Sequence, residues 1–97
     1  MIFWQDDTDG NKKKRTGESD LFVLKANGFR VVLHRVIGLE GWFVSCYGLN
    51  VEKRELESEE LEDAKKEALE LIDGIAAVEI SKLVNLRTQF EMEGVGK

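Results

Sequence analysis

The order of apolar and polar residues predicts an antiparallel sheet in the middle of the chain. The stretch "DLFVLKANGFRVVLHRV" contains two β-type runs that Asn27-Gly28 separates. This pair is typical of a type I′ hairpin turn, because both central residues of that turn need a positive φ. The turn fixes three cross-strand pairs, which are Ala26–Phe29, Leu24–Val31 and Phe22–Leu33. All six side chains are apolar and share one face, so this face is predicted to enter the core.

A third strand, "WFVSCY", follows the loop "GLEG". A four-residue loop predicts the pairs Ile37–Trp42, Arg35–Val44 and Leu33–Cys46. This register adds apolar residues to the core face, but it also brings Arg35 there. The opposite face has a mixed character and carries His34, Phe43, Ser45 and Tyr47. A short fourth strand is expected over residues 52–56.

Helical periodicity dominates residues 58–92. Ser58 is the expected N-cap, and the acidic residues that follow suit the positive end of the helix dipole. Apolar residues recur at helical spacing at Leu61, Ala64, Ala68, Leu71, Ile72, Ile75, Ala76, Ile80, Leu83, Leu86 and Phe90. One unbroken helix would be about 50 Å long. Either it breaks near residues 73–74 and folds back onto the mixed face, or its second half projects and packs on another molecule.

The first twenty residues are mostly polar. Residues 2–4 are expected to form a short strand, and residues 5–19 a flexible polar loop. Asp7, Asp9 and Gly10 have a spacing that is similar to a calcium-binding loop. Gln5 and Thr16 stand where that loop needs carboxylates, so an ordinary turn is favoured.

Together these patterns predict one α+β domain over residues 1–97. A three- or four-stranded antiparallel meander over residues 20–56 packs against one or two C-terminal helices. The expected core residues are Phe22, Leu24, Phe29, Val31, Leu33, Trp42, Val44, Leu61, Ala68 and Ile72.

Composition excludes most enzyme chemistry. The 97 residues include one cysteine, one histidine and no proline. Strand parity places Cys46 and His34 on opposite faces, which argues against a nucleophile and base pair. One His and one Cys do not make a zinc site, and no phosphate-binding glycine loop is present. We therefore expect no enzyme, metal or cofactor. The lone cysteine suits a cytoplasmic protein, and no apolar run is long enough for a membrane span.

Negative charge concentrates in one segment. The net charge is −5, and residues 37–73 carry eleven acidic side chains against four basic ones. The acidic helix face is either the solvated back of a packing helix or a surface that docks on a basic protein partner. The candidate partner-binding residues are Glu60, Asp63, Glu67 and Glu70. Lys65 and Lys66 interrupt this row.

Two further surfaces remain as candidates. The stripe formed by Ile80, Leu83, Leu86 and Phe90 extends past the sheet that could cover it, so it predicts a homodimer interface. The alternative function is nucleic-acid binding through the basic run "NKKKR" and the mixed sheet face. Its candidate contacts are Lys12, Lys13, Lys14, Arg15, Lys25 and Arg30. A solvated loop that keeps a sheet edge soluble explains the same basic run.

The order strand, strand, strand, helix over residues 20–72, with "EDAKKEALELI" in the closing helix, resembles double-stranded-RNA-binding domains. It also resembles the β-β-β-α domains of the HicB antitoxin and integrase arm-binding types. The resemblance is one of topology. The place of the basic loop of the RNA-binding family is taken by the acidic "EKRELESEE", so no functional residue carries over. The short, proline-free, charge-segregated chain is similar to small accessory proteins of bacteriophages.

Overall fold

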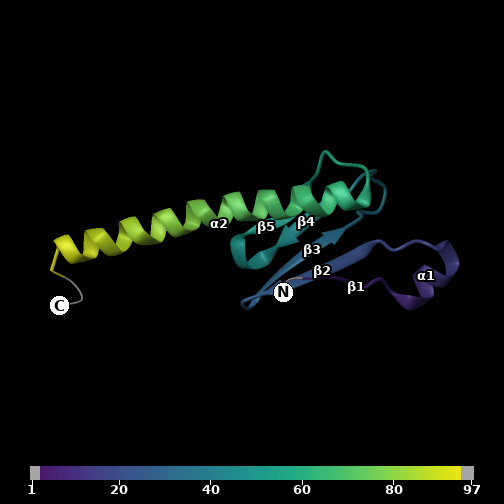
Figure 1. Ribbon diagram of the computed structural model, residues 1–97, viewed down its shortest axis with the longest axis horizontal. Helices are drawn as coiled ribbons and strands as arrows, with labels where there is room; N and C mark the ends of the chain where they lie inside the picture. Colours follow the sequence, from purple (N-terminus) through teal and green to yellow (C-terminus); the bar gives the residue numbers. More distant parts are fainter. Residues whose placement is uncertain (1–2, 95–97) are drawn as a thin grey trace.

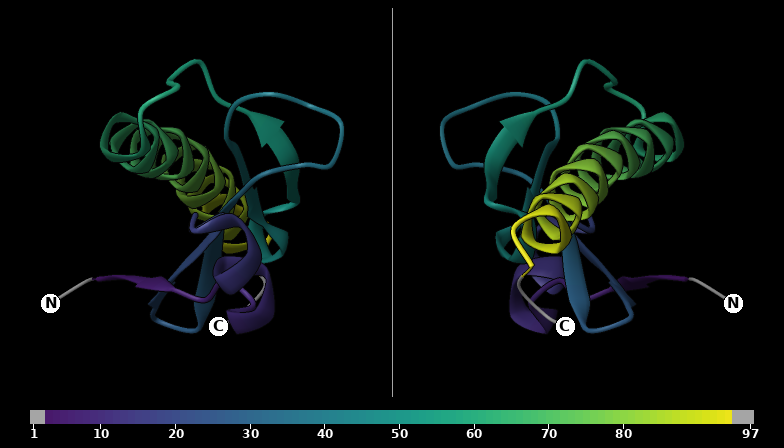
Figure 2. Two further views of the ribbon diagram at one scale, coloured as in Figure 1. Left: turned by 90° about the vertical axis from the view of Figure 1, so that its right-hand side faces the viewer. Right: turned by 90° about the vertical axis from the view of Figure 1, so that its left-hand side faces the viewer.

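The computed structural model describes residues 3–94, and it confirms the α+β class (Figure 1). Five antiparallel strands follow one another across the sheet in chain order, more than the three or four expected for the meander, because β1 joins it. The elements are β1 (Trp4–Asp6), α1 (Gly10–Thr16), β2 (Leu21–Ala26), β3 (Phe29–His34), β4 (Phe43–Cys46), the 3-10 turn η1 (Tyr47–Leu49), β5 (Val51–Glu55) and α2 (Leu61–Met92). Helix α2 lies on one face of the sheet (Figure 2), and α1 lies beyond the sheet's end.

The first hairpin has the predicted register. Ala26 pairs with Phe29, Leu24 with Val31 and Phe22 with Leu33. Asn27 and Gly28 form the turn with φ values of 50° and 84°. Asn tolerates a positive φ and Gly has no Cβ to strain, so this dipeptide is sufficient to set the pairing.

The predicted register of the second hairpin is wrong by two residues. Leu33 pairs with Val44, and Arg35 lies beyond the end of β3. The Arg35 guanidinium stacks over the Trp42 ring at 4.0 Å from the centroid and donates to the Gly41 carbonyl at 2.8 Å. A shift of two residues keeps every side chain on its face, so Trp42 and Val44 still reach the core.

The last strand pair contains a β-bulge. Val44 pairs with Arg54 and Cys46 with Val51, so two residues of β5 lie opposite Ser45. One of them, Lys53, has a φ of 46°. Its backbone N–H points out of the ladder and donates to Ser45 Oγ at 2.8 Å. The bulge therefore uses a buried hydroxyl to satisfy the hydrogen bond that the ladder cannot make.

The core lies between the sheet and the first half of α2. Its buried members are Phe22, Leu24, Val31, Leu33, Trp42, Val44, Cys46, Val51, Leu56, Ala64, Ala68 and Ile72. Small alanines at the helix contact let α2 approach the strands closely. Two expected core residues are exceptions, because Leu61 is only half-buried and Phe29 is 43% exposed.

The polar loop expected over residues 5–19 is wrong in part, because it contains the end of β1 and all of α1. Thr8 Oγ1 accepts the N–H groups of Asp20 and Leu21 at 3.0 and 3.2 Å and so ties the segment to β2. Asp9 accepts the Asn11 N–H at the start of α1. The expected strand over residues 2–4 begins instead at Trp4, and Ile2 lies outside the described residues.

Helix α2 is continuous through residues 73–74, so the fold-back alternative is excluded. Its buried residues all lie in the first half, and every residue from 80 to 94 is exposed. The molecule measures 61 × 24 × 23 Å and has a Cα radius of gyration of 17.3 Å. A compact chain of this length has about 12–13 Å. Residues 77–92, which we call the α2 overhang, extend clear of the sheet (Figure 1).

Candidate protein-interaction surfaces

The acidic face of α2 is partly committed to internal structure. The Glu67 carboxylate accepts the backbone N–H groups of Glu57 and Ser58 at 2.9 and 2.8 Å, and the Ser58 hydroxyl at 2.7 Å. These bonds fasten the loop between β5 and α2 onto the second turn of the helix. The prediction that Ser58 is the N-cap is wrong. Glu60 takes that position, and no side chain caps the helix there.

The three donors also determine the acidity of Glu67. Partial burial raises the pKa of this carboxyl, but the hydrogen bonds from Glu57 and Ser58 outweigh that effect and hold the pKa below its ordinary value. Each donor stabilises the ionised form. Glu67 is thus a charged anchor for a loop, and a partner would have to compete with backbone groups for it.

The remaining candidates on this face, Glu60, Asp63 and Glu70, are exposed. Asp63 and Glu70 line a shallow hollow with Lys66 between them. Lys65 pairs with Glu62 at 3.2 Å, and its ammonium lies 4.9 Å from the centroid of the Phe22 ring. The row therefore contains charges of both signs.

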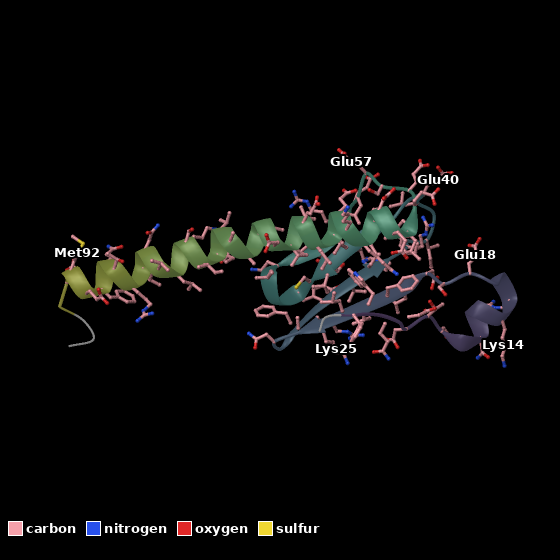
Figure 3. The ribbon with its side chains drawn as sticks, viewed as in Figure 1. Lys14, Glu18, Lys25, Glu40, Glu57 and Met92 are labelled. Carbon is pink, nitrogen blue, oxygen red and sulfur yellow. The ribbon has the colours of Figure 1, made fainter. Side chains whose placement is uncertain are left out.

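The candidate basic residues whose side chains the structure describes do not gather into one patch. Lys14 lies on α1 beyond one end of the sheet, and Lys25 lies near the hairpin turn at the other end (Figure 3). Arg30 forms an ion pair with Asp7 at 3.6 Å. Arg15 is exposed on α1, and the side chains of Lys12 and Lys13 lie outside the described residues. A phosphate backbone would thus meet separated and partly neutralised charges.

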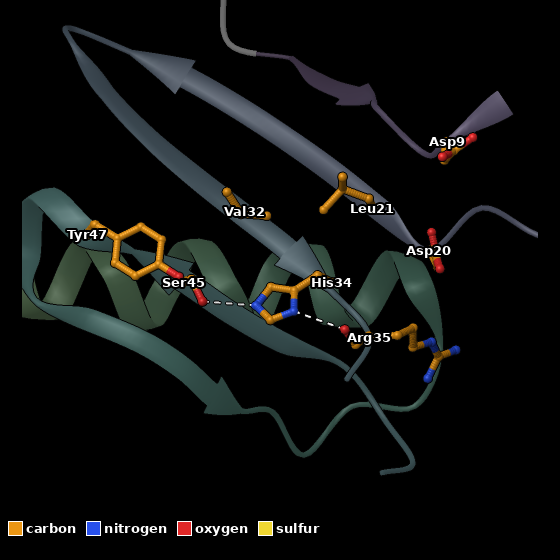
Figure 4. Close-up of a pocket in the computed structure, with 8 residues that line it drawn as sticks. All are labelled: Asp9, Asp20, Leu21, Val32, His34, Arg35, Ser45 and Tyr47. Atoms are coloured by element: carbon orange, nitrogen blue, oxygen red, sulfur yellow. Dashed lines mark hydrogen bonds between the residues drawn. The ribbon is translucent and has the colours of Figure 1, made fainter. Parts of the chain in front are cut away.

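The mixed face of the sheet contains a cavity of about 410 Å³ around His34 and Ser45 (Figure 4). His34 Nδ1 lies 3.1 Å from the Arg35 carbonyl oxygen, and Nε2 lies 2.9 Å from Ser45 Oγ. A carbonyl only accepts, so Nδ1 carries the hydrogen in the neutral ring. Nε2 then accepts the Ser45 hydroxyl hydrogen, while Ser45 Oγ accepts from Lys53.

This cluster is structural. Ser45 is 2% exposed, and its oxygen already bonds a ring nitrogen and a backbone N–H. A nucleophile needs access to substrate and a base that an acid orients. Cys46 is fully buried on the opposite face, as strand parity predicts. Among residues 3–94, no group of His, Cys, Asp or Glu side chains is placed to hold a metal ion.

Of the three rings on the mixed face, only Tyr47 is widely exposed. Phe43 is buried and stacks on His34 at a centroid distance of 6.4 Å. A sheet that binds single strands presents a row of accessible rings. The mixed face has one such ring and a half-buried imidazole, so it offers little for successive bases to stack on.

Exposed apolar residues run along α2. Its groove, of about 570 Å³, lies where the helix leaves the sheet. We call this the apolar groove; its walls are Leu24, Ala26, Phe29, Val31 and Leu49 on the sheet side and Leu69, Glu70, Ile72, Asp73 and Ala76 on α2. The exposed large apolar residues of the overhang are Val78, Ile80, Leu83, Val84, Leu86, Phe90 and Met92. Sequence reasoning found the stripe but missed the groove, whose one signal was Phe29 beside the hairpin turn.

In comparisons with known proteins, no family model matches this chain, and no curated protein or solved structure matches it. Within the described residues, no helix has both the length and the apolarity that crossing a membrane requires.

Proposed function

We propose that this protein is a non-enzymatic interaction module that binds a protein partner through the α2 overhang. The observation that carries this proposal is the continuation of α2 past the sheet with its apolar stripe exposed. Ile80 and Leu83 are 61% and 59% exposed, although they continue the spacing of the buried residues. Contiguous exposed apolar surface of this kind marks an interaction site.

The free-energy cost of exposed apolar surface also supports a partner that binds the α2 overhang. Exposed apolar area costs about 25 cal/mol per Å² relative to burial. In proteins most helical stability comes from the packing of an amphipathic face, and the sheet gives residues 77–92 no such packing. A partner that covers the stripe therefore supplies both the burial and the packing that the sheet cannot provide.

Site-specific photo-cross-linking tests the proposal. The photoreactive residue p-benzoylphenylalanine replaces Leu86 in one version of the full chain and Tyr47 in a matched version. Both positions are exposed, but Tyr47 lies on the mixed sheet face. We expect light-dependent protein adducts at position 86 and few at position 47. Adducts confined to position 47, or none at either position, would contradict the proposal.

Binding to nucleic acid is the competing function. An oligonucleotide titration at several salt concentrations separates the two, because phosphate binding weakens steeply with salt. The divided basic residues and the ion pair of Arg30 with Asp7 predict no specific binding of short single- or double-stranded oligonucleotides. Micromolar binding with a steep salt slope would replace the proposal by the nucleic-acid alternative.

A further inference from the structure

We infer that the partner of the α2 overhang is a second copy of this chain, which binds antiparallel about a two-fold axis near Ile80. In this pair the overhang of each copy lies in the apolar groove of the other. The inference rests on the proposed function, because it assigns an occupant to the same surface. It is carried by three features of α2: one continuous row, matched shapes and complementary charges.

The row joins the groove to the overhang. Its members are spaced alternately three and four residues apart, and they are Leu69, Ile72, Ala76, Glu79, Leu83, Leu86 and Phe90. This is the seven-residue repeat by which two helices pack side by side. The first three members form the helical wall of the groove, and the last three are exposed on the overhang. One helix face therefore carries both halves of an interface.

The shapes of the two halves match in an antiparallel pair. Pairing centred near Ile80 sets Phe90 of one copy against Leu69 of the other, and Leu83 against Ala76. The small Ala76 side chain and the groove beside it leave room for the larger one. Both contacts occur twice, as a two-fold axis requires. A parallel pair would set groove beside groove and leave both unfilled.

The charges at the edge of the row also match. The same pairing brings Asp73 of each copy close to Arg87 of the other, because these residues lie seven positions on either side of Ile80, within one residue of the centre. Both are exposed, and residues at this place in the repeat face each other across antiparallel helices. Each dimer therefore contains two ion pairs between Asp73 of one copy and Arg87 of the other. A parallel pair does not bring these residues together.

One row member is polar and lies at the centre. Glu79 is half-buried and bonds its own Lys82 at 3.3 Å. A single polar residue in an otherwise apolar row fixes the register of paired helices and weakens their association. Glu79→Leu is therefore expected to tighten the dimer, provided that the row is the interface.

Sedimentation equilibrium of the full chain across micromolar concentrations tests the inference. We expect a reversible monomer–dimer equilibrium that Leu83→Glu abolishes. Val78→Glu is the matched control, because Val78 is 54% exposed on the same overhang but lies off the row. It should leave the dimer constant unchanged. Circular dichroism confirms that each variant keeps its helix, since all the changes are at exposed positions.

Charge reversal tests the antiparallel geometry. Asp73→Arg and Arg87→Asp should each weaken the dimer about tenfold, because two attractive pairs become repulsive. The double variant should restore the original constant. Failure of the double variant to restore dimerisation would overturn the antiparallel arrangement, as would an equal effect of Val78→Glu.

The photo-cross-linking version at Leu86 separates this inference from the proposed function. An adduct of twice the chain mass supports both. A chain that stays monomeric at all concentrations, yet forms adducts with a different protein at position 86, overturns the dimer and leaves the interaction module standing. A monomer without adducts overturns both.

Discussion

Glu67 shows that an acidic residue on a helix surface can stabilise the fold through internal hydrogen bonds. The sequence places it in a charged row with Asp63 and Glu70, and residue type alone cannot separate these three. Its backbone donors are the N–H groups of Glu57 and Ser58, ten and nine residues earlier. The sequence carries no signal for those contacts, because every residue has a backbone N–H. Only the path of the β5–α2 loop distinguishes a carboxylate that holds this loop from one that is available to a partner.

Glu67→Gln is therefore expected to destabilise the fold by about 1 kcal/mol, because a neutral amide oxygen replaces a charged acceptor of three hydrogen bonds. Glu70→Gln, one helical turn away and exposed, is the control and should change stability little. Chemical denaturation of both variants measures the difference. Equal stability of the two variants would show that the loop holds without Glu67.

The same residue predicts a pH dependence. Its pKa is lowered in the folded state, so the unfolded chain binds the proton more readily. The stabilisation is complete above the ordinary glutamate pKa and is lost as the pH falls through the lowered value. Thermal melting from neutral to acidic pH should show the gap between the wild type and Glu67→Gln closing in that window. A gap that stays constant would contradict the assignment.

Among the elements, those whose structure is set by neighbouring residues in the sequence were predicted best. Asn27-Gly28 encodes its turn within two residues, and the register of the first hairpin is correct. The loop before β4 has no such pair. Its closure depends on the stacking of Arg35 over Trp42, which pairing rules do not include. The sequence did not predict helix α1, because its seven residues have no apolar periodicity. The segment around it is held by backbone N–H groups that donate to the side chains of Thr8 and Asp9.

Helix α2 passes through Gly74 without a break, which makes this residue a site for stabilisation. A Cβ at this position would meet no atom within 4 Å. Gly74→Ala should stabilise the protein by about 1 kcal/mol, because alanine restricts the unfolded chain and favours the helix. Gly28→Ala is the contrasting variant, since its φ of 84° strains any side chain. It should lower the melting temperature while Gly74→Ala raises it, and no change in either would contradict this account.

At the scale of the whole molecule, the sequence predicted the apolar stripe of the candidate interface but not the apolar groove. The stripe from Ile80 to Phe90 follows from spacing within one helix. The groove does not, because it joins Phe29 on the sheet to Ile72 on α2, and that neighbourhood depends on how the helix crosses the strands. The expected length of the helix could not decide whether it folds back near residues 73–74 or projects from the sheet.

The extended shape gives a direct solution test. Small-angle scattering of Leu83→Glu, the variant expected to stay monomeric, should give a radius of gyration near the 17.3 Å of the structure. A helix folded back at Gly74 would bring it close to the 12–13 Å of a compact chain, roughly the size expected for this length. The wild type at high concentration should give a larger value than the variant.

The chain-order meander of the sheet has a consequence for how fast the molecule reaches its native state. Every strand pairs with its neighbour in sequence, so each closing step is local in the chain; the longest connection, residues 7–20, contains α1. Local closure costs little entropy. The chain has no proline, so no peptide-bond isomerisation delays folding. The monomer is therefore expected to refold in a single rapid exponential phase, and any slower phase would have to depend on collisions between chains.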